Sequence, residues 1–178
     1  MNALISLHHS VFSRLDRADW LLPTLARLAF LAVLFVYYWN SALLKIDDSI
    51  FTPSSGAFGQ IFPKAAEAVL WNVEEMTFFQ RLVIFAGTVT EFVLPVLIVI
   101  GLFSRLAALG TIGFIIVQTV VDVTGHGAKL GTWFDTSIAL IDERTLWVFL
   151  LLVIVIKGAG PLSLDRLLGG RIAPADVD

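Results

Sequence analysis

The chain has 178 residues, of which 57% are hydrophobic and 15% are charged, and its formal net charge is -3. This apolar fraction and the mean hydropathy of +0.86 exceed the ordinary range of soluble domains, so the composition predicts a membrane protein whose partner is the lipid bilayer. The charge, with no basic run, argues against a nucleic-acid partner. The absence of cysteine excludes disulfides and thiolate chemistry, so any redox role needs a bound cofactor or a partner protein.

The two ends of the chain are predicted to lie on the membrane surface. Residues 1–22 form the first segment, because apolar residues recur at helical spacing over residues 3–15 and Trp20 is of a type that anchors at membrane interfaces. Residues 161–178 are predicted to form a cytoplasmic surface helix, capped by Ser163, and a polar tail.

Residues 23–160 are predicted to hold four transmembrane helices. The uncharged residues 28–44 belong to the first, and the apolar residues 82–104 and 106–121 form the second and third. The fourth apolar run, residues 146–156, has only 11 residues and must extend through neighbouring charges in order to span. We therefore expect an all-α fold, a four-helix transmembrane bundle with short amphipathic surface helices.

Two polar residues interrupt the second and third spans at matching positions. Glu91 lies about 16 Å and Gln118 about 18 Å along their helices from the turn that joins them, so both have nearly the same depth. Steps of four residues place Asp122 and His126 on the same helical face as Gln118. Pro95 removes the backbone hydrogen bond to the Glu91 carbonyl, which predicts a kink beside the carboxylate. Because ionisable groups inside membranes are rare and usually functional, Glu91 is interpreted as a catalytic proton relay.

An amide near the end of the first span completes a candidate ligand-binding set. Asn40 needs hydrogen-bond partners from a neighbouring helix or from a ligand at that depth. We therefore group Asn40 with Glu91, Gln118, Asp122 and His126 as the residues expected to bind a ligand.

The loops predict an acidic outer mouth. Seven basic residues lie on the side of both termini and five lie on the other side, and this excess predicts that the termini are cytoplasmic. Acidic residues are concentrated on the outer side. There, residues 46–80 form a loop with a short helix from Pro63 over the bundle mouth. This charge favours cationic or neutral guests, and the candidate metal ligands are Asp122, His126 and Asp135, the last following a glycine-rich stretch.

The second and third spans share the pattern TEFVLPVLIVIGLFSRLAALG, the first span carries RLAF and YYWNSALLKI, and the fourth closes with IKGAGPLSLDRLL. In these motifs nearly the whole chain resembles the DoxX family of small four-helix bacterial membrane proteins. The resemblance implies a multi-pass protein of the bacterial inner membrane with an accessory role in redox systems, and other members are associated with copper handling through modified peptides. Only Glu91, Pro95 and Arg105 are carried over from the family pattern.

Three functions remain open from the sequence. The first is a membrane subunit that holds a quinone near Glu91, Gln118 and Asn40 while a redox partner supplies electrons, since no nicotinamide, flavin or haem motif is present. The second is a transporter or metal-handling component with a cation site at the outer mouth. The third is a structural partner protein, which could be oligomeric, whose polar residues hold the helices together. The sequence leaves open whether the chain alone is an enzyme.

Overall fold

The computed structural model describes residues 2–16, 18–134 and 139–172. In this part of the chain the secondary structure is helical, apart from an isolated bridge between Ile46 and Pro53. The elements are α1 (Asn2–Asp16), α2 (Leu21–Phe30), η1 (Leu31–Phe35), α3 (Val36–Leu44), α4 (Ser55–Ile61), α5 (Pro63–Ala68), η2 (Val73–Glu75), α6 (Phe78–Ile100), α7 (Ser104–His126), α8 (Leu140–Lys157) and α9 (Leu164–Ile172). The prediction of an all-α fold is confirmed for the described residues.

Three helices among the described residues are long and apolar enough to cross a membrane. They are the continuous helix Leu21–Leu44, which comprises α2, η1 and α3, and the helices α6 and α7. The fourth long helix, α8, carries Asp142, Glu143 and Arg144 in its first turns and Lys157 at its end, so its composition alone does not qualify it. The chain is therefore a membrane protein with three helices that are long and apolar enough to span.

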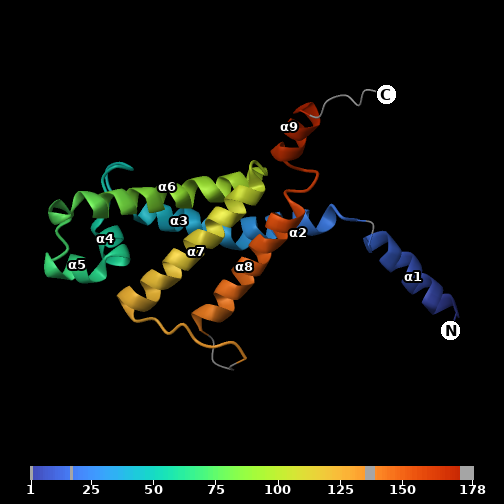
Figure 1. Cartoon of the computed structure of the whole chain (residues 1–178), viewed down its shortest axis with the longest axis horizontal. Coiled ribbons are helices and arrows are strands. Elements are labelled where there is room, and N and C mark those ends of the chain that lie inside the picture. Colours follow the sequence, from blue (N-terminus) through green and yellow to red (C-terminus); the bar gives the residue numbers. More distant parts are fainter. Residues whose placement is uncertain (1, 17, 135–138, 173–178) are drawn as a thin grey trace.

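The long helices pack around one apolar core. Helix α3 packs on α6, α6 on α7, α7 on α8, and α8 returns to α2, so the contacts form a closed ring. In Figure 1, α6 lies along α2 and α3, whereas the antiparallel pair α7 and α8 crosses them. The core residues Phe30, Leu34, Ile98, Leu151 and Ile154 are fully or almost fully buried where these helices meet.

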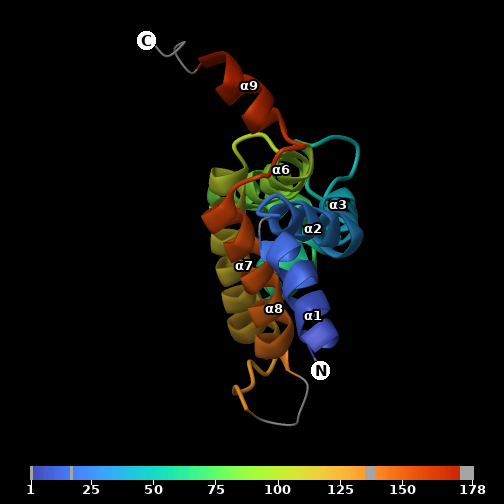
Figure 2. The same cartoon turned by 90° about the vertical axis from the view of Figure 1, so that its right-hand side faces the viewer.

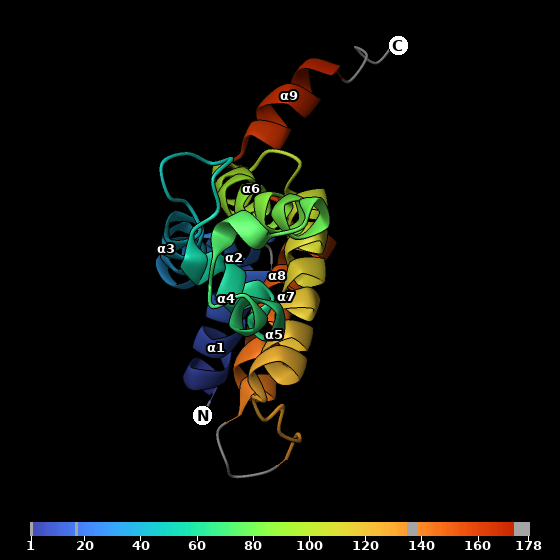
Figure 3. The same cartoon turned by 90° about the vertical axis from the view of Figure 1, so that its left-hand side faces the viewer.

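Helices α6 and α7 diverge from the turn that joins them. Helices α4 and α5 lie at the open end, where α4 contacts α6 and α5 contacts α7; Figure 3 looks onto this end. A second apolar cluster, which includes Phe58, Met76 and Ile84, holds α4 and α5 against the start of α6. The short helix predicted from Pro63 is confirmed as α5, and together with α4 it covers this end of the bundle.

The first span contains a π-helical turn that the sequence analysis did not predict. Its buried residues Ala26, Phe30, Leu34, Tyr38 and Ala42 recur at strict intervals of four. On a regular α-helix, four residues advance about 400°, so this row would drift by about 40° at each step. The wider turn η1 counters the drift and keeps the row facing the core. The regular four-residue spacing was the available signal.

Helices α1 and α9 extend away from the bundle at the end where α2 begins and α8 ends (Figures 1 and 2). In α1 the apolar side chains Ile5, Leu7, Phe12 and Leu15 are at least half exposed. Such unburied apolar surface on a helix beside membrane spans suits the interfacial position that the sequence predicts.

Arg27 ties three segments together at this same end. Its guanidinium donates hydrogen bonds to the carbonyls of Ile98 (3.0 Å) and Val99 at the end of α6. It also donates to Ala159 (2.8 Å) and Leu162 (2.6 Å) after α8. A cation at a helix carboxyl terminus interacts favourably with the helix dipole. Arg27 satisfies the Val99 carbonyl, and it adds a second donor to the Ile98 carbonyl, which also accepts from the Gly101 amide at 3.2 Å.

Asp165 caps α7 from a distant part of the chain. Its carboxylate accepts hydrogen bonds from the amides of Phe103 (2.7 Å) and Ser104 (3.0 Å) and from the Ser104 hydroxyl (2.9 Å). Burial alone would raise the pKa of Asp165, but these bonds and the charge of Arg27 hold the pKa below its ordinary value. The predicted cap of α9 is also confirmed, because the Ser163 hydroxyl accepts a bond from the Arg166 amide (3.3 Å).

Substitution of Asp165 by asparagine should destabilise the protein by about 1 kcal/mol at neutral pH, the usual loss for a helix cap. Because the pKa of Asp165 is lower in the folded than in the unfolded state, its stabilisation is complete above the ordinary pKa of 3.8. The stabilisation is lost as the pH falls through the folded pKa. Unfolding in mixed micelles should therefore show a difference between wild type and Asp165→Asn that shrinks as the pH falls below about 4. A difference independent of pH would contradict this role.

Candidate functional site

Three of the five predicted ligand residues meet at a cavity of about 220 Å³ between α3, α6 and α7. They are Glu91 and Gln118, which were predicted at one depth, and Asp122, which was predicted on the same helical face as Gln118. The lining is completed by Lys45, Gln60, Ile61, Val83, Ala86, Gly87, Thr90, Phe114, Val117 and Val121. Gln60 and Ile61 belong to α4, so the cavity lies beneath the helices that fill the open end between α6 and α7.

A buried ion pair forms the polar end of this cavity. The Lys45 ammonium donates to both carboxylate oxygens of Glu91, at 3.0 and 2.8 Å, and both side chains are 3% exposed. The Ser41 hydroxyl donates to Glu91 at 3.0 Å and lies 2.7 Å from the Lys45 nitrogen. Glu91 is thus neutralised and hydrogen-bonded, as a buried charge must be in order to persist in a low-dielectric interior.

The position of Lys45 corrects the sequence analysis, which placed it at the outer interface. The first span ends beside the middle of α6, and α4 with α5 supplies the layer beyond it. Lys45 is therefore buried in the bundle rather than extended to the lipid headgroups. The partners of Glu91 are Lys45 and Ser41, neither of which is in the predicted ligand set.

A second polar group lies next to the cavity on the side of α8. Asp122 accepts a 2.7 Å bond from Arg144, whose other guanidinium nitrogen lies 3.4 Å from the Thr119 hydroxyl. The guanidinium also lies 5.0 Å from the ring centre of Trp147, at cation-π distance. Asp122 therefore has a cationic partner of its own, which sequence reasoning did not identify.

Two tyrosines bring further hydroxyls to this region. The Gln118 amide donates to the Tyr37 hydroxyl, while the Gln118 carbonyl oxygen is buried without a partner among the described residues. The Tyr38 hydroxyl is also buried and unpartnered within that part of the chain. Tyr38 lines a narrow crevice together with Thr90, Glu91 and Pro95. Helix α6 continues through Pro95, so the freed Glu91 carbonyl lies beside this crevice.

Two members of the predicted set lie away from the cavity. Asn40 is exposed, and Ser41 occupies the place expected for it beside Glu91. Helix α7 persists to His126, but the His126 ring bonds the Gln60 carbonyl at 2.7 Å and does not line the cavity. Asp135 lies outside the described residues. Among the residues that the structure describes, no group of three histidine, aspartate or glutamate side chains could hold a metal ion.

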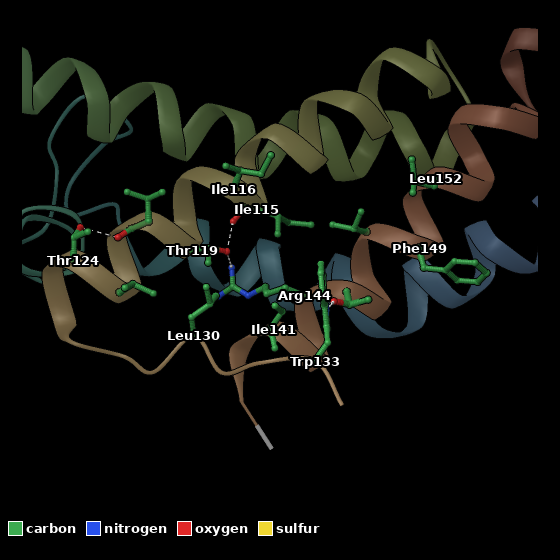
Figure 4. Close-up of a pocket in the computed structure, with 14 residues that line it drawn as sticks. Ile115, Ile116, Thr119, Thr124, Leu130, Trp133, Ile141, Arg144, Phe149 and Leu152 are labelled. Atoms are coloured by element: carbon green, nitrogen blue, oxygen red, sulfur yellow. Dashed lines mark hydrogen bonds between the residues drawn. The ribbon is translucent and has the colours of Figure 1, made fainter. Parts of the chain in front are cut away.

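A larger cavity of about 570 Å³ runs along the outer faces of α7 and α8 (Figure 4). Its walls are almost entirely apolar, and Arg144 reaches into it toward Thr119. Trp133 lies at one end, where its indole donates to the Thr145 hydroxyl at 2.9 Å. An apolar groove between membrane helices suits lipid chains, whereas the smaller cavity gathers the groups that can exchange protons or bind a polar ligand.

The chemistry of the smaller cavity follows from its donors and acceptors. The three ammonium protons of Lys45 are engaged by the two Glu91 oxygens and the Ser41 hydroxyl. The Gln118 amide presents an N–H group that suits a ligand carbonyl oxygen, and Glu91 can accept or release a proton. Phe114 and the aliphatic lining provide an apolar wall for a flat ring. No family model matches the chain, and no curated protein or solved structure is significantly similar to it.

Proposed function

We propose that the protein is an accessory membrane subunit that holds a quinone head group in the cavity between α3, α6 and α7 and serves a redox partner. The observation that carries this proposal is the buried Lys45–Glu91 pair, which lines one cavity together with Gln118. A quinone has two carbonyl oxygens that accept hydrogen bonds, and it takes up protons when it is reduced. The Gln118 amide would donate to a carbonyl, and Glu91 would exchange the proton.

The size and position of the cavity support a ring-sized guest. A volume of about 220 Å³ is smaller than the roughly 300–1,000 Å³ of drug-sized ligand sites. The head group would therefore fill the cavity while its apolar tail extended into lipid. Gly87 and Ala86 line the α6 side, and a β-carbon added at Gly87 meets no atom within 4 Å, so this wall is open.

The geometry favours a neutral guest over a cation. The two carboxylates that line the cavity are already paired, Glu91 with Lys45 and Asp122 with Arg144. A cation would have to displace an ammonium or a guanidinium held by hydrogen bonds at 3.0 Å or less. A neutral carbonyl compound leaves both ion pairs intact.

The wider proposal is a four-span protein of the DoxX type in a bacterial inner membrane, with both termini cytoplasmic. Support for a fourth span comes from α8, which packs along α7 and α2 and buries Trp147, Leu151 and Ile154. Its buried Arg144 is paired with Asp122, which removes the main electrostatic objection to placing this residue within the membrane.

Quinone binding can be tested on protein in lipid nanodiscs with a short-chain ubiquinone as the probe, measured by quenching of tryptophan fluorescence. Gln118→Leu should weaken binding about tenfold, because it removes one buried hydrogen bond to a quinone carbonyl. Asn40→Leu is the matched control, since this amide lies on an exposed face, and its affinity should equal that of wild type. Equal affinities of Gln118→Leu and wild type, or no saturable binding at all, would refute the proposal.

A further inference from the structure

A separate cavity of about 480 Å³ lies at the opposite end of the bundle from α4 and α5. It is enclosed by the start of α7, the loop after α8 and the start of α9. The lining residues are Phe103, Ser104, Arg105, Leu106, Gly158, Ala159, Gly160, Ser163, Asp165 and Arg166. Helices α6, α7 and α8 all begin or end here, so the cavity lies where the apolar spans give way to polar segments.

Two arginines give this cavity its charge. Arg105 comes from the first turn of α7 and Arg166 from α9, and both side chains are exposed. Within the described residues, no hydrogen bond or ion pair joins either guanidinium to the protein, whereas nearby Lys157 has Asp19 as a partner at 3.4 Å. The cavity therefore presents two planar donor groups whose hydrogen bonds are open to a ligand.

The other charged groups at the cavity are already engaged. Both Asp165 oxygens accept bonds from the first amides of α7 and from the Ser104 hydroxyl. The amino terminus of α7 is thus capped by the protein, and the Ser163 hydroxyl donates to the Gly160 carbonyl at 2.6 Å. The open positive charge comes from the two arginines alone.

One of these arginines, Arg105, lies against the backbone of the loop after α8. Gly158 has φ of +78°, a conformation that favours glycine, and a β-carbon placed there would lie 3.4 Å from Arg105 Nε. The guanidinium therefore lies against the loop and at the wall of the cavity rather than extending freely into solvent. This contact places a guanidinium donor, as well as a charge, at the wall of the cavity.

We propose that this cavity binds a phosphate group, held by Arg105 and Arg166, and that its source is the headgroup of an anionic phospholipid. Guanidinium groups donate paired hydrogen bonds to phosphate oxygens, and basic pockets between membrane helices at this depth recognise anionic headgroups. A soluble phosphate ester offers the same oxygens, so the experiment must separate the two sources. The site is independent of the quinone cavity, because none of its lining residues is shared with that cavity.

Native mass spectrometry of the detergent-purified full chain can measure binding of phosphatidylglycerol, phosphatidylcholine and inorganic phosphate. Wild type should retain one phosphatidylglycerol in preference to phosphatidylcholine. The double variant Arg105→Gln/Arg166→Gln should bind phosphatidylglycerol about ten- to thirtyfold more weakly, the effect expected for two lost cationic contacts. The matched control Lys64→Gln/Lys129→Gln removes the same charge from exposed residues outside this cavity and should bind as wild type does.

The outcomes separate the alternatives. Loss of the preference in the arginine variant alone, with inorganic phosphate unable to displace the lipid, supports a headgroup site. Displacement by inorganic phosphate at a concentration equal to that of the lipid supports the phosphate site but assigns it to a soluble ester. Equal binding of the two lipids by wild type, or a preference that survives in the arginine variant, overturns the proposal. Since no hydrogen bond joins either guanidinium to the part of the chain that the structure describes, circular dichroism should confirm that the variant remains folded.

Discussion

Replacement of Lys45 by methionine should destabilise the protein by about 3–5 kcal/mol, the usual loss when one partner of a buried ion pair is removed. The reason is the environment of Glu91, which is 3% exposed and whose carboxylate would keep only the hydrogen bond from Ser41. Unfolding by sodium dodecyl sulfate in mixed micelles, followed by circular dichroism, measures the change in free energy. The variant should also lose quinone binding, because Glu91 would lose the cation that holds its carboxylate at the cavity.

A double-mutant cycle separates the loss of the pair from the loss of packing. Lys45→Met/Glu91→Gln removes both charges with similar side-chain volumes, and buried pairs replaced as a unit often leave stability nearly unchanged. We expect the double variant to recover most of the stability that Lys45→Met loses, yet not to bind quinone. If the single and double variants were equally unstable, Lys45 would act through its packing and not through its charge.

Replacement of Arg27 by methionine should destabilise the protein by about 3 kcal/mol or more, since each buried carbonyl left without a donor costs about 1–3 kcal/mol. Three carbonyls lose their Arg27 donor and keep no other among the described residues, that of Val99 at the end of α6 and those of Ala159 and Leu162 after α8. The Ile98 carbonyl also loses Arg27 but keeps the Gly101 amide at 3.2 Å. The same micelle unfolding assay applies. Limited proteolysis should also cut the loop between α8 and α9 faster in the variant than in wild type, because the Arg27 hydrogen bonds hold Ala159 and Leu162 in place.

Arg27→Lys is the matched control for charge. It keeps a cation at the carboxyl end of α6 but has no planar fork to reach four carbonyls at once, so it should recover only part of the stability. Full recovery would show that the charge, rather than the hydrogen bonds, holds these segments together. A loss below 1 kcal/mol in Arg27→Met would contradict the assigned role.

The candidate site shows which spatial relations between residues can be predicted from the sequence. Glu91 and Gln118 could be placed at one depth because both are counted from the same short turn, and both line one cavity. Lys45 was missed because its depth depends on where the first span ends relative to α6, and no short turn links the two helices. Asn40 was expected at the site because it is an amide near the end of the first span, whereas the helix face that meets Glu91 carries its neighbour Ser41.

The polar contacts between segments that are distant in the chain also could not be predicted from the sequence. Arg144 reaches Asp122 across the loop between α7 and α8, and Asp165 caps α7 from 61 or 62 residues along the chain. These bonds depend on helix crossing and on loop paths, which the composition of either segment does not encode. The sequence indicates only that such buried polar groups need partners.

The sequence by itself determined that this is a helical membrane protein, where its three apolar spans lie, and that Glu91 and Gln118 interrupt two of them at a common depth. These properties follow from local chemistry, because the length of an apolar run and the helical rise fix span and depth. Only the tertiary structure decided which groups meet: Lys45 with Glu91, Arg144 with Asp122, and Arg105 with Arg166 at the far cavity. The reason is physical, since each of these pairings depends on how helices cross and end, and those are set by packing of the whole chain.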